Sequence, residues 1–301
     1  MSIRDFTRED IEAVFKASDL MLELYDREKY SRLLEGKILA LLFFEPSTRT
    51  RISFEVAMKR LGGAVIGFAE PYMSSVQKGE TLIDTVRVLD GYADVLVIRH
   101  PNEGAARLAA EYAQHPVINA GSGRQEHPTQ ALLDLYTIYK EKGAIDGLCV
   151  GVMGDLRYAR TVNSLLLALA NFKVDVHLVS PVPFLDPRPA LLEEIRNKVA
   201  VQLHRRLQEV LPQLDVLYIT RVQKERFPDP SEYERVRGTY FVNRDTLKEA
   251  KDDLLILHPL PRVDELSIDV DTLPGAAYFR QAHYGVIVRM ALLALVLGAL
   301  Q

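Results

Sequence analysis

The stretch ILALLFFEPSTRTRISFEVAMKRL, residues 38–61, joins an apolar run to a periodic segment through a turn rich in hydrogen-bond donors. The run 38–44 predicts a buried strand, and the apolar positions after the turn are spaced as on one face of a helix. Pro46 permits a sharp reversal between the two, and Ser47 or Thr48 is suited to cap the helix. The turn would therefore direct free backbone N–H groups and the positive end of a helix dipole outward.

This turn predicts an anion site, most naturally for phosphate. Ser47, Thr48, Arg49, Thr50 and Arg51 place hydroxyl and guanidinium donors next to one another at the start of the helix. In the alternative interpretation, the hydroxyls are ordinary helix caps and the arginines are solvated surface charges. We favour the anion site because like charges packed so closely repel each other unless a negative group neutralises them.

Composition limits the classes of protein to consider. The chain has 301 residues, 48% of them hydrophobic, which is enough for two ordinary domains. Its 37 basic and 41 acidic residues give a net charge of −4, so no global positive field is present to hold nucleic acid or an anionic membrane. The N-terminal sequence lacks the apolar core of a signal peptide, and the single cysteine, Cys149, cannot form an intrachain disulfide. We therefore expect a cytoplasmic protein without membrane spans.

Apolar runs and helical patterns alternate along the chain, which predicts parallel sheets covered by helices. Strands are expected at 38–44, 64–69, 94–98 and 117–119, and again at 148–153, 174–179, 199–203, 216–220 and 254–257. The expected fold class is α/β, with two domains that each contain a mainly parallel sheet flanked by helices. Because ligands bind beyond the carboxyl ends of such strands, the residues that follow each strand are the candidates for a site.

Several of these strand ends carry cations or amides. Arg99 follows a buried strand and is either a ligand-binding residue or the partner of Glu103 in a structural ion pair. The segment GSGRQEHPTQ leads into a helix and presents His127 and Gln130 together, so both could address one small polar ligand. A single histidine at a helix start is more often a cap or a packing residue. The loop PYMSSVQKGE contains Lys78, which a nearby anion site would attract.

Other functional classes lack their motifs. The run GVMGD, residues 151–155, lacks the third glycine of the dinucleotide-binding fingerprint. The seven histidines are scattered and the cysteine is alone, so no metal site is predicted. A serine hydrolase is also disfavoured, because the chain has no G-x-S-x-G motif.

With these residues identified, the chain resembles the catalytic chains of the aspartate carbamoyltransferase family along nearly its whole length. The matching segments are, in family order, FFEPSTRTRISFE, QKGETLIDT, IRHPNEGAAR, HPTQALLDL, GDLRYARTVNS, TRVQKER and HPLPRVDE. The resemblance implies transfer of the carbamoyl group of carbamoyl phosphate to L-aspartate in pyrimidine biosynthesis, with no cofactor. The PSTRTR and HPxQ elements also occur in ornithine carbamoyltransferases. The alternatives are therefore a carbamoyltransferase for another amine such as ornithine, or a non-catalytic anion-binding homologue.

The resemblance also implies roles for individual residues. The catalytic set would be Arg49, Thr50, Arg99 and His127. Carbamoyl phosphate would be bound by Ser47, Thr48, Arg49, Thr50, Ser74, Lys78, Arg99, His127, Gln130, Pro259, Leu260 and Pro261. Aspartate would be bound by Lys78, Arg160, Arg221 and Gln223, and domain closure would use Glu45, Arg160 and Arg226.

Finally, the resemblance implies an organisation for the chain. Residues 1–128 with 285–301 would form the carbamoyl phosphate-binding domain and residues 129–284 the aspartate-binding domain, with the C-terminal helix packing back on the first domain. Members of the family form homotrimers with shared active sites, in which Ser74 and Lys78 would enter the neighbour's site. Assembly with a separate regulatory chain is left open.

Overall fold

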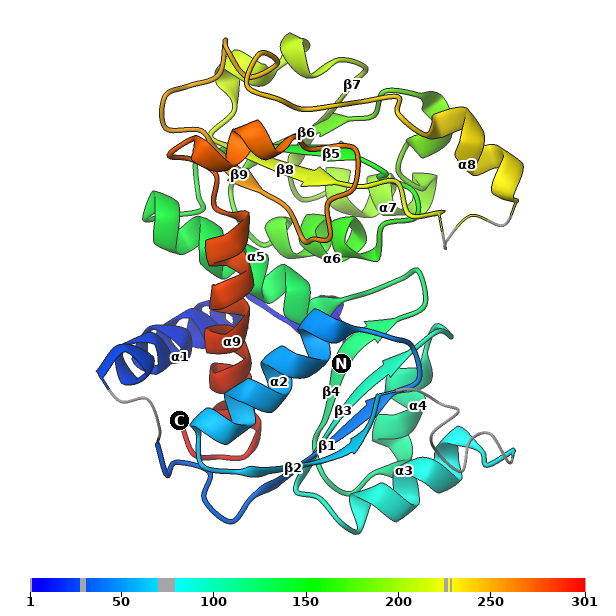
Figure 1. Ribbon diagram of the computed structural model, residues 1–301, viewed down its shortest axis with the longest axis vertical. Helices are drawn as coiled ribbons and strands as arrows, with labels where there is room; N and C mark the ends of the chain where they lie inside the picture. Colours follow the sequence, from blue (N-terminus) through cyan, green and yellow to red (C-terminus); the bar gives the residue numbers. More distant parts are fainter. Residues whose placement is uncertain (1, 28–30, 70–78, 225–226, 228, 301) are drawn as a thin grey trace. The chain divides into compact units, whose positions relative to one another are not determined.

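The computed structural model describes residues 2–27, 31–69, 79–224, 227 and 229–300 (Figure 1). The chain divides into unit 1, Met1–Tyr136 with His283–Gln301, and unit 2, Thr137–Ala282. It passes from unit 1 to unit 2 within helix α5 (Pro128–Lys142) and returns within helix α9 (Tyr278–Val296). The limits predicted above for the two functional domains stay a prediction.

Unit 1 contains a parallel sheet whose four described strands run in the order β2-β1-β3-β4. Its elements before α5 are η1 (Ile3–Asp5), α1 (Arg8–Arg27), β1 (Ile38–Phe43), α2 (Thr48–Arg60), β2 (Ala64–Phe68), α3 (Leu82–Asp90), β3 (Val95–His100), α4 (Ala105–Tyr112) and β4 (Val117–Ser122). The order has a consequence for ligand binding. Strands β1 and β3 are neighbours, but the chain continues from β1 to one side of the sheet and from β3 to the other.

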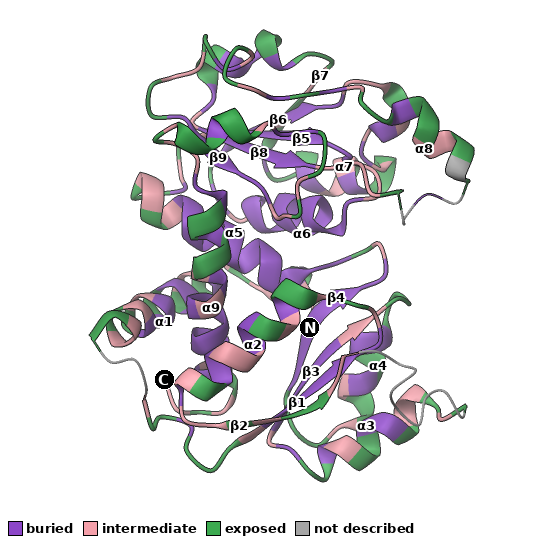
Figure 2. Cartoon of the chain, viewed as in Figure 1, coloured by how far each residue is buried: buried purple, intermediate pink, exposed green. Residues whose placement is uncertain are grey.

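Helices cover the unit 1 sheet, as the apolar strands require. Strand β1 reads ILALLF and is buried from its second residue onward, which is typical of a parallel strand covered on both faces (Figure 2). Val86 of α3 and Ala106 and Ala109 of α4 belong to the hydrophobic cluster on one face. Helices α1, α2 and α9 lie on the other side (Figure 1). The rings of Tyr25 in α1 and His283 in α9 are 5.0 Å apart, so the C-terminal helix packs back on unit 1 as predicted.

Unit 2 contains a second parallel sheet, whose five described strands run in the order β7-β6-β5-β8-β9. Its elements between α5 and α9 are β5 (Cys149–Gly154), α6 (Arg160–Leu169), β6 (Asp175–Val179), η4 (Pro183–Leu185), α7 (Pro189–Arg196), β7 (Ala200–His204), η5 (Leu207–Glu209), η6 (Leu211–Gln213), β8 (Val216–Thr220), α8 (Pro230–Val236), β9 (Leu255–Leu257) and η8 (Ile268–Thr272). Strands β5 and β8 are neighbours, but the chain continues from β5 to β6 on one side of the sheet and from β8 to β9 on the other. Each sheet therefore has one position where the strand order reverses.

The predicted fold class is confirmed, and the predicted strands differ from the observed ones chiefly at their ends. Strand β3 extends to His100 and β4 to Ser122, so Arg99 lies within the last residues of a strand rather than after it. Pairing explains the extension, because Arg99 is held in register beside Phe43 of β1. Within the described ranges, no helix combines the length and the apolar character that crossing a membrane would require.

Candidate active site

In unit 1 the reversal of strand order brings two predicted site segments together. The carboxyl ends of β1 and β3 are adjacent, with Phe43 and Arg99 in register and the Phe44 N–H donating to the Arg99 carbonyl at 2.8 Å. The turn 45–50 leaves β1 toward one side, while the chain after β3 leaves toward the other (Figure 1). Ligands of open parallel sheets bind at such a point because the diverging loops leave room between them.

The turn into α2 has the character of an anion site. Ser47 occupies the N-cap position in an extended conformation, but its hydroxyl makes no capping hydrogen bond. Thr48 and Arg49 are exposed, whereas Thr50 is buried. The first N–H groups of α2 and the hydroxyl groups of the turn therefore lie at the positive end of a helix of 13 residues. Arg51 belongs instead to the helix surface, since it pairs with Glu55 at 3.3 Å.

Arg99 is paired with Glu45 in this structure. Its Nη2 lies 3.1 Å from Glu45 Oε1, and the two side chains are only 12% and 19% exposed. The sequence offered Glu103 as an ion-pair partner, because Glu103 is close in the chain. Sheet pairing brings Glu45 to Arg99 from more than fifty positions away. The Arg99 guanidinium, which is expected to bind phosphate, is therefore paired with the Glu45 carboxylate in this structure.

His127 and Gln130 are both buried at the start of α5, which begins at Pro128. The His127 ring lies 3.5 Å from the Thr129 hydroxyl. The Gln130 amide nitrogen donates to Asp134 Oδ1 at 2.8 Å, and Asp134 is completely buried. Because one N–H of the amide is taken by Asp134, the carbonyl oxygen of Gln130 stays available to accept from a ligand. That orientation suits recognition of another amide.

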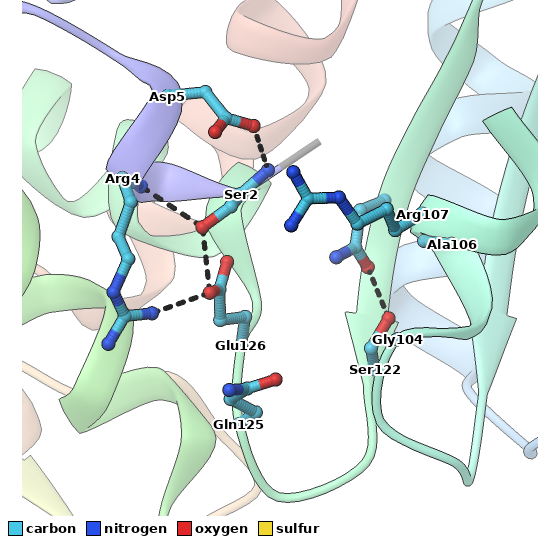
Figure 3. Close-up of a pocket in the computed structure, with 10 residues that line it drawn as sticks. Ser2, Arg4, Asp5, Gly104, Ala106, Arg107, Ser122, Gln125 and Glu126 are labelled. Atoms are coloured by element: carbon cyan, nitrogen blue, oxygen red, sulfur yellow. Dashed lines mark hydrogen bonds and ion pairs between the residues drawn. The ribbon is translucent and has the colours of Figure 1, made fainter. Parts of the chain in front are cut away.

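A cavity lies beside the same segment, between η1, the turn before α5 and the start of α4 (Figure 3). Glu126 accepts from Ser2 Oγ and from Arg4 Nη1, each at 2.7 Å (Figure 3). It also accepts the Ile3 N–H at 3.1 Å. Glu126 directly precedes His127, so these contacts connect the N-terminal segment to the start of α5. None of the predicted site residues that the structure describes lines this cavity, so it is a neighbour of the candidate site and not the site itself.

In unit 2 the second reversal collects the residues expected to bind the acceptor substrate. Gly154 at the end of β5 is in register with Thr220 at the end of β8. Arg160 begins α6 after β5 and is buried, while Arg221 and Gln223 follow β8 directly. Two arginines and an amide therefore belong to the loops of one switch point, as the strand-end argument predicted.

Asp155 connects these two loops, and the sequence interpretation missed it. Its carboxylate is fully buried and accepts the N–H of Tyr158 at 2.9 Å and the N–H of Gln223 at 3.4 Å. Burial raises the pKa of Asp155 to about 6, although these hydrogen bonds and nearby Arg221 act in the opposite direction. A carboxylate directly after a buried strand was the signal that could have identified it.

The segment after β9 supplies the remaining predicted residues of unit 2. Pro259, Leu260 and Pro261 form a turn in which Leu260 has a positive φ of 56° and the Leu260–Pro261 peptide bond is cis. Because β9 pairs with β8, this turn starts from the strand next to Arg221.

Some predicted residues cannot be placed. Ser74, Lys78 and Arg226 lie outside the described residues. Among the residues that are described, no group of three or more His, Cys, Asp or Glu side chains is arranged to hold a metal ion.

Comparison with known proteins gives matches along both units. Residues 1–140 match the family model for the carbamoyl-P binding domain of aspartate/ornithine carbamoyltransferase, and residues 146–296 match the model for its Asp/Orn binding domain. The aspartate carbamoyltransferase catalytic subunit of Pyrobaculum islandicum is 56% identical over 99% of this chain and 97% of that protein. The catalytic subunit from Methanopyrus kandleri is 57% identical over 99% of this chain and 96% of that protein.

Solved structures give the same result. The catalytic subunit of M. jannaschii aspartate transcarbamoylase is similar with a TM-score of 0.91 and 51% identity, covering 99% of this chain and 97% of that one. Aspartate transcarbamoylase from Trypanosoma cruzi, in complex with carbamoyl phosphate and aspartate, has a TM-score of 0.90 and 43% identity, covering 97% of this chain and 93% of that one.

Proposed function

This chain belongs to the aspartate/ornithine carbamoyltransferase family, and we propose that it transfers the carbamoyl group of carbamoyl phosphate to the amine of L-aspartate. The products are N-carbamoyl-L-aspartate and phosphate. One observation carries the proposal: the turn 47–50 and Arg99 follow or end the strands at the reversal of strand order in unit 1, and Arg160, Arg221 and Gln223 follow the strands at the reversal in unit 2. The unit 1 set suits a phosphate beside an amide, and the unit 2 set suits the carboxylates of the acceptor.

In the proposed complex the phosphate is bound by the hydroxyl and N–H groups of the turn 47–50 together with Arg49 and Arg99. Thr50, Arg99 and His127 donate to the carbonyl oxygen on which negative charge develops during attack. Gln130 accepts from the carbamoyl NH₂ group. The Asp134 contact supports this last role, because it leaves the Gln130 carbonyl oxygen as the acceptor.

Aspartate is bound by the cations and the amide of unit 2. Arg160 and Arg221 take the two carboxylates and Gln223 adds an amide, and Lys78 contributes by family resemblance. Glu45 is proposed to pair with Arg160 and with Arg226 when the two domains close over the substrates. Pro259, Leu260 and Pro261 complete the binding of the carbamoyl group.

The chemistry needs orientation and charge stabilisation more than a reactive group of the enzyme. The α-amine of aspartate forms the new C–N bond, the C–O bond to phosphate breaks, and the departing phosphate accepts the amine proton. The enzyme accelerates this step by holding amine and carbonyl at reacting distance and by stabilising the developing oxyanion. The reaction itself requires no cofactor.

A steady-state assay with two acceptors tests the choice of substrate. We expect carbamoyl transfer to L-aspartate and little or none to L-ornithine, whose cationic side chain Arg221 and Lys78 would repel. Preference for ornithine would overturn the assignment. Binding of carbamoyl phosphate without turnover of either amine, measured by calorimetry, would instead identify a non-catalytic homologue.

We further propose a cytoplasmic homotrimer that acts in pyrimidine biosynthesis and in which Ser74 and Lys78 complete the neighbouring site. The test mixes inactive Lys78→Ala chains with inactive Arg49→Ala chains. If sites are shared, some sites in the mixed trimers combine two intact halves, and part of the activity returns. Mixed trimers that remain inactive would show that each chain builds its own site. The mass of the native particle tests for a separate regulatory chain.

A further inference from the structure

A buried histidine controls the turn after β9 in unit 2. His258 is 1% exposed, and its backbone N–H donates to Oε1 of Gln281 at 2.9 Å. Its ring then contacts two further parts of the same turn. Nδ1 lies 2.8 Å from the N–H of Leu260, and Nε2 lies 2.7 Å from Oε1 of Glu265, which is 2% exposed.

These contacts determine the protonation state of the ring. A backbone N–H is only a donor, so Nδ1 must accept and cannot carry a proton. A neutral imidazole carries one proton, which must therefore be on Nε2 and point at Glu265. Glu265 also accepts the N–H groups of Val263 and Asp264, each at 3.2 Å. Its carboxylate thus orients the ring and holds the far end of the turn.

The contact to Nδ1 fixes the direction of a carbonyl group. The Leu260 N–H belongs to the same planar peptide as the Pro259 carbonyl, and in a trans peptide these two groups point in opposite directions. Holding the N–H on the ring therefore aims the Pro259 carbonyl away from His258. Leu260 itself has a positive φ, a conformation that is unfavourable for leucine and needs support from its surroundings.

We propose that His258 is a positioning residue for carbamoyl transfer: its Nδ1 acceptor sets the plane of the Pro259–Leu260 peptide, so that the turn presents its carbonyl oxygens to the carbamoyl NH₂ group. The proposal rests on the proposed function, which gives those carbonyls their ligand. His258 itself touches no reacting atom.

The surroundings keep the ring neutral. Burial lowers the pKa of His258 below its ordinary value, and the cations Arg221 and Arg262 act in the same direction, while Glu265 opposes them. Protonation would place an N–H on Nδ1 opposite the N–H of Leu260 and would break the contact. Affinity for carbamoyl phosphate is therefore expected to fall at acidic pH, below the ordinary histidine range.

Two substitutions separate positioning from simple packing. In His258→Asn the amide oxygen can replace Nδ1 as the acceptor for Leu260, although the contact to Glu265 is lost. In His258→Gln the amide can reach Glu265, but no acceptor remains near Leu260. We expect His258→Gln to raise the KM for carbamoyl phosphate at least tenfold and His258→Asn to raise it less than threefold.

Inorganic phosphate is the matched ligand control, because it lacks the carbamoyl amide. Its Kd, measured by calorimetry, is expected to stay within twofold of wild type in both variants. Equal KM values for carbamoyl phosphate in the two variants, or parallel losses for phosphate and carbamoyl phosphate, would show that His258 only supports packing. Thermal unfolding monitors the integrity of each variant.

A measurement on the wild-type enzyme keeps the proposal testable if the variants do not fold. In protein labelled with ¹⁵N-histidine, the His258 resonances at pH 8 are expected to show the Nε2-protonated tautomer. An Nδ1-protonated or doubly protonated ring would overturn the proposal. Failure of the wild type to carbamoylate aspartate would remove the proposed function, whereas unchanged KM values in His258→Gln with normal wild-type turnover would remove only the positioning role.

Discussion

The pairing of Glu45 with Arg99 predicts that Glu45→Gln strengthens phosphate binding. Arg99 Nη2 donates to Glu45 Oε1 at 3.1 Å, and both side chains are mostly shielded from water. A phosphate that binds Arg99 must displace the Glu45 carboxylate from it, and it is also repelled by the negative charge of that carboxylate. Removing the charge while keeping the shape of the side chain therefore removes a competitor of the ligand.

The size of the effect follows from the value of one hydrogen bond to a charged group. Such a bond contributes about 1.5–3 kcal/mol, which corresponds to a factor of roughly 10 to 150 in Kd. The lower end applies, because in Glu45→Gln the amide oxygen can still accept from Arg99 and only the negative charge is lost. We expect the Kd of inorganic phosphate to fall about tenfold in Glu45→Gln, as measured by isothermal titration calorimetry without aspartate.

Glu55→Gln is the matched control. Glu55 is a partly exposed carboxylate in α2 that pairs with Arg51 and Lys59, so this substitution changes the net charge equally without touching Arg99. Its effect on the phosphate Kd is expected to stay below twofold.

A second measurement on Glu45→Gln is the KM for aspartate, which should rise if Glu45 also stabilises the closed state by pairing with Arg160 and Arg226. An unchanged or weaker phosphate affinity in Glu45→Gln would refute the competition argument.

Three further predictions concern single side chains. Arg49→Ala should lower kcat by roughly 10²–10³ with little change in thermal stability, because Arg49 is exposed, and near wild-type turnover would mean that the turn is only a helix cap. Asp134→Ala, which leaves no acceptor for the Gln130 amide, should raise the KM for carbamoyl phosphate about fivefold, since the orientation of Gln130 is lost with roughly 1 kcal/mol of hydrogen bonding, and an unchanged KM would contradict that role. The folded-state pKa of Asp155 is raised to about 6. Its contribution to the free energy of unfolding is therefore fully present below the ordinary pKa of 3.8 and is lost as pH rises through about 6. Asp155→Asn should therefore flatten the dependence of Tm on pH between about pH 4 and pH 6, and an equally steep dependence in the variant would contradict the shift.

Several candidate site residues could be named from the sequence because local chemistry marks them. The turn 47–50 combines helix-cap hydroxyls with Arg49, and the helix start at Pro128 places His127 and Gln130 one turn apart. Arg160 and Arg221 follow buried strands. In each case a short segment contains both the element that holds the side chain and the side chain itself, so no distant contact is needed to predict it.

Other features depend on partners that are remote in the chain. Glu45 meets Arg99 because β1 and β3 are neighbours, and Asp155 meets the N–H of Gln223 because β5 and β8 are neighbours. No local pattern encodes strand order, which is set by how whole strands and helices pack. For the same reason the sequence placed the end of β3 too early.

By itself the sequence determined that this protein is built from two parallel sheets, because continuous apolar strands alternating with amphipathic helices bury well only in that arrangement. It also determined which side chains are available at the strand ends, and its motifs indicated the family. The tertiary structure decided which strand ends become neighbours, and hence that Arg99 is held by Glu45 and that His258 controls the turn at Leu260. The physical reason is that hydrogen bonds and ion pairs act over about 3 Å, so only the packed chain defines which groups lie within reach of each other.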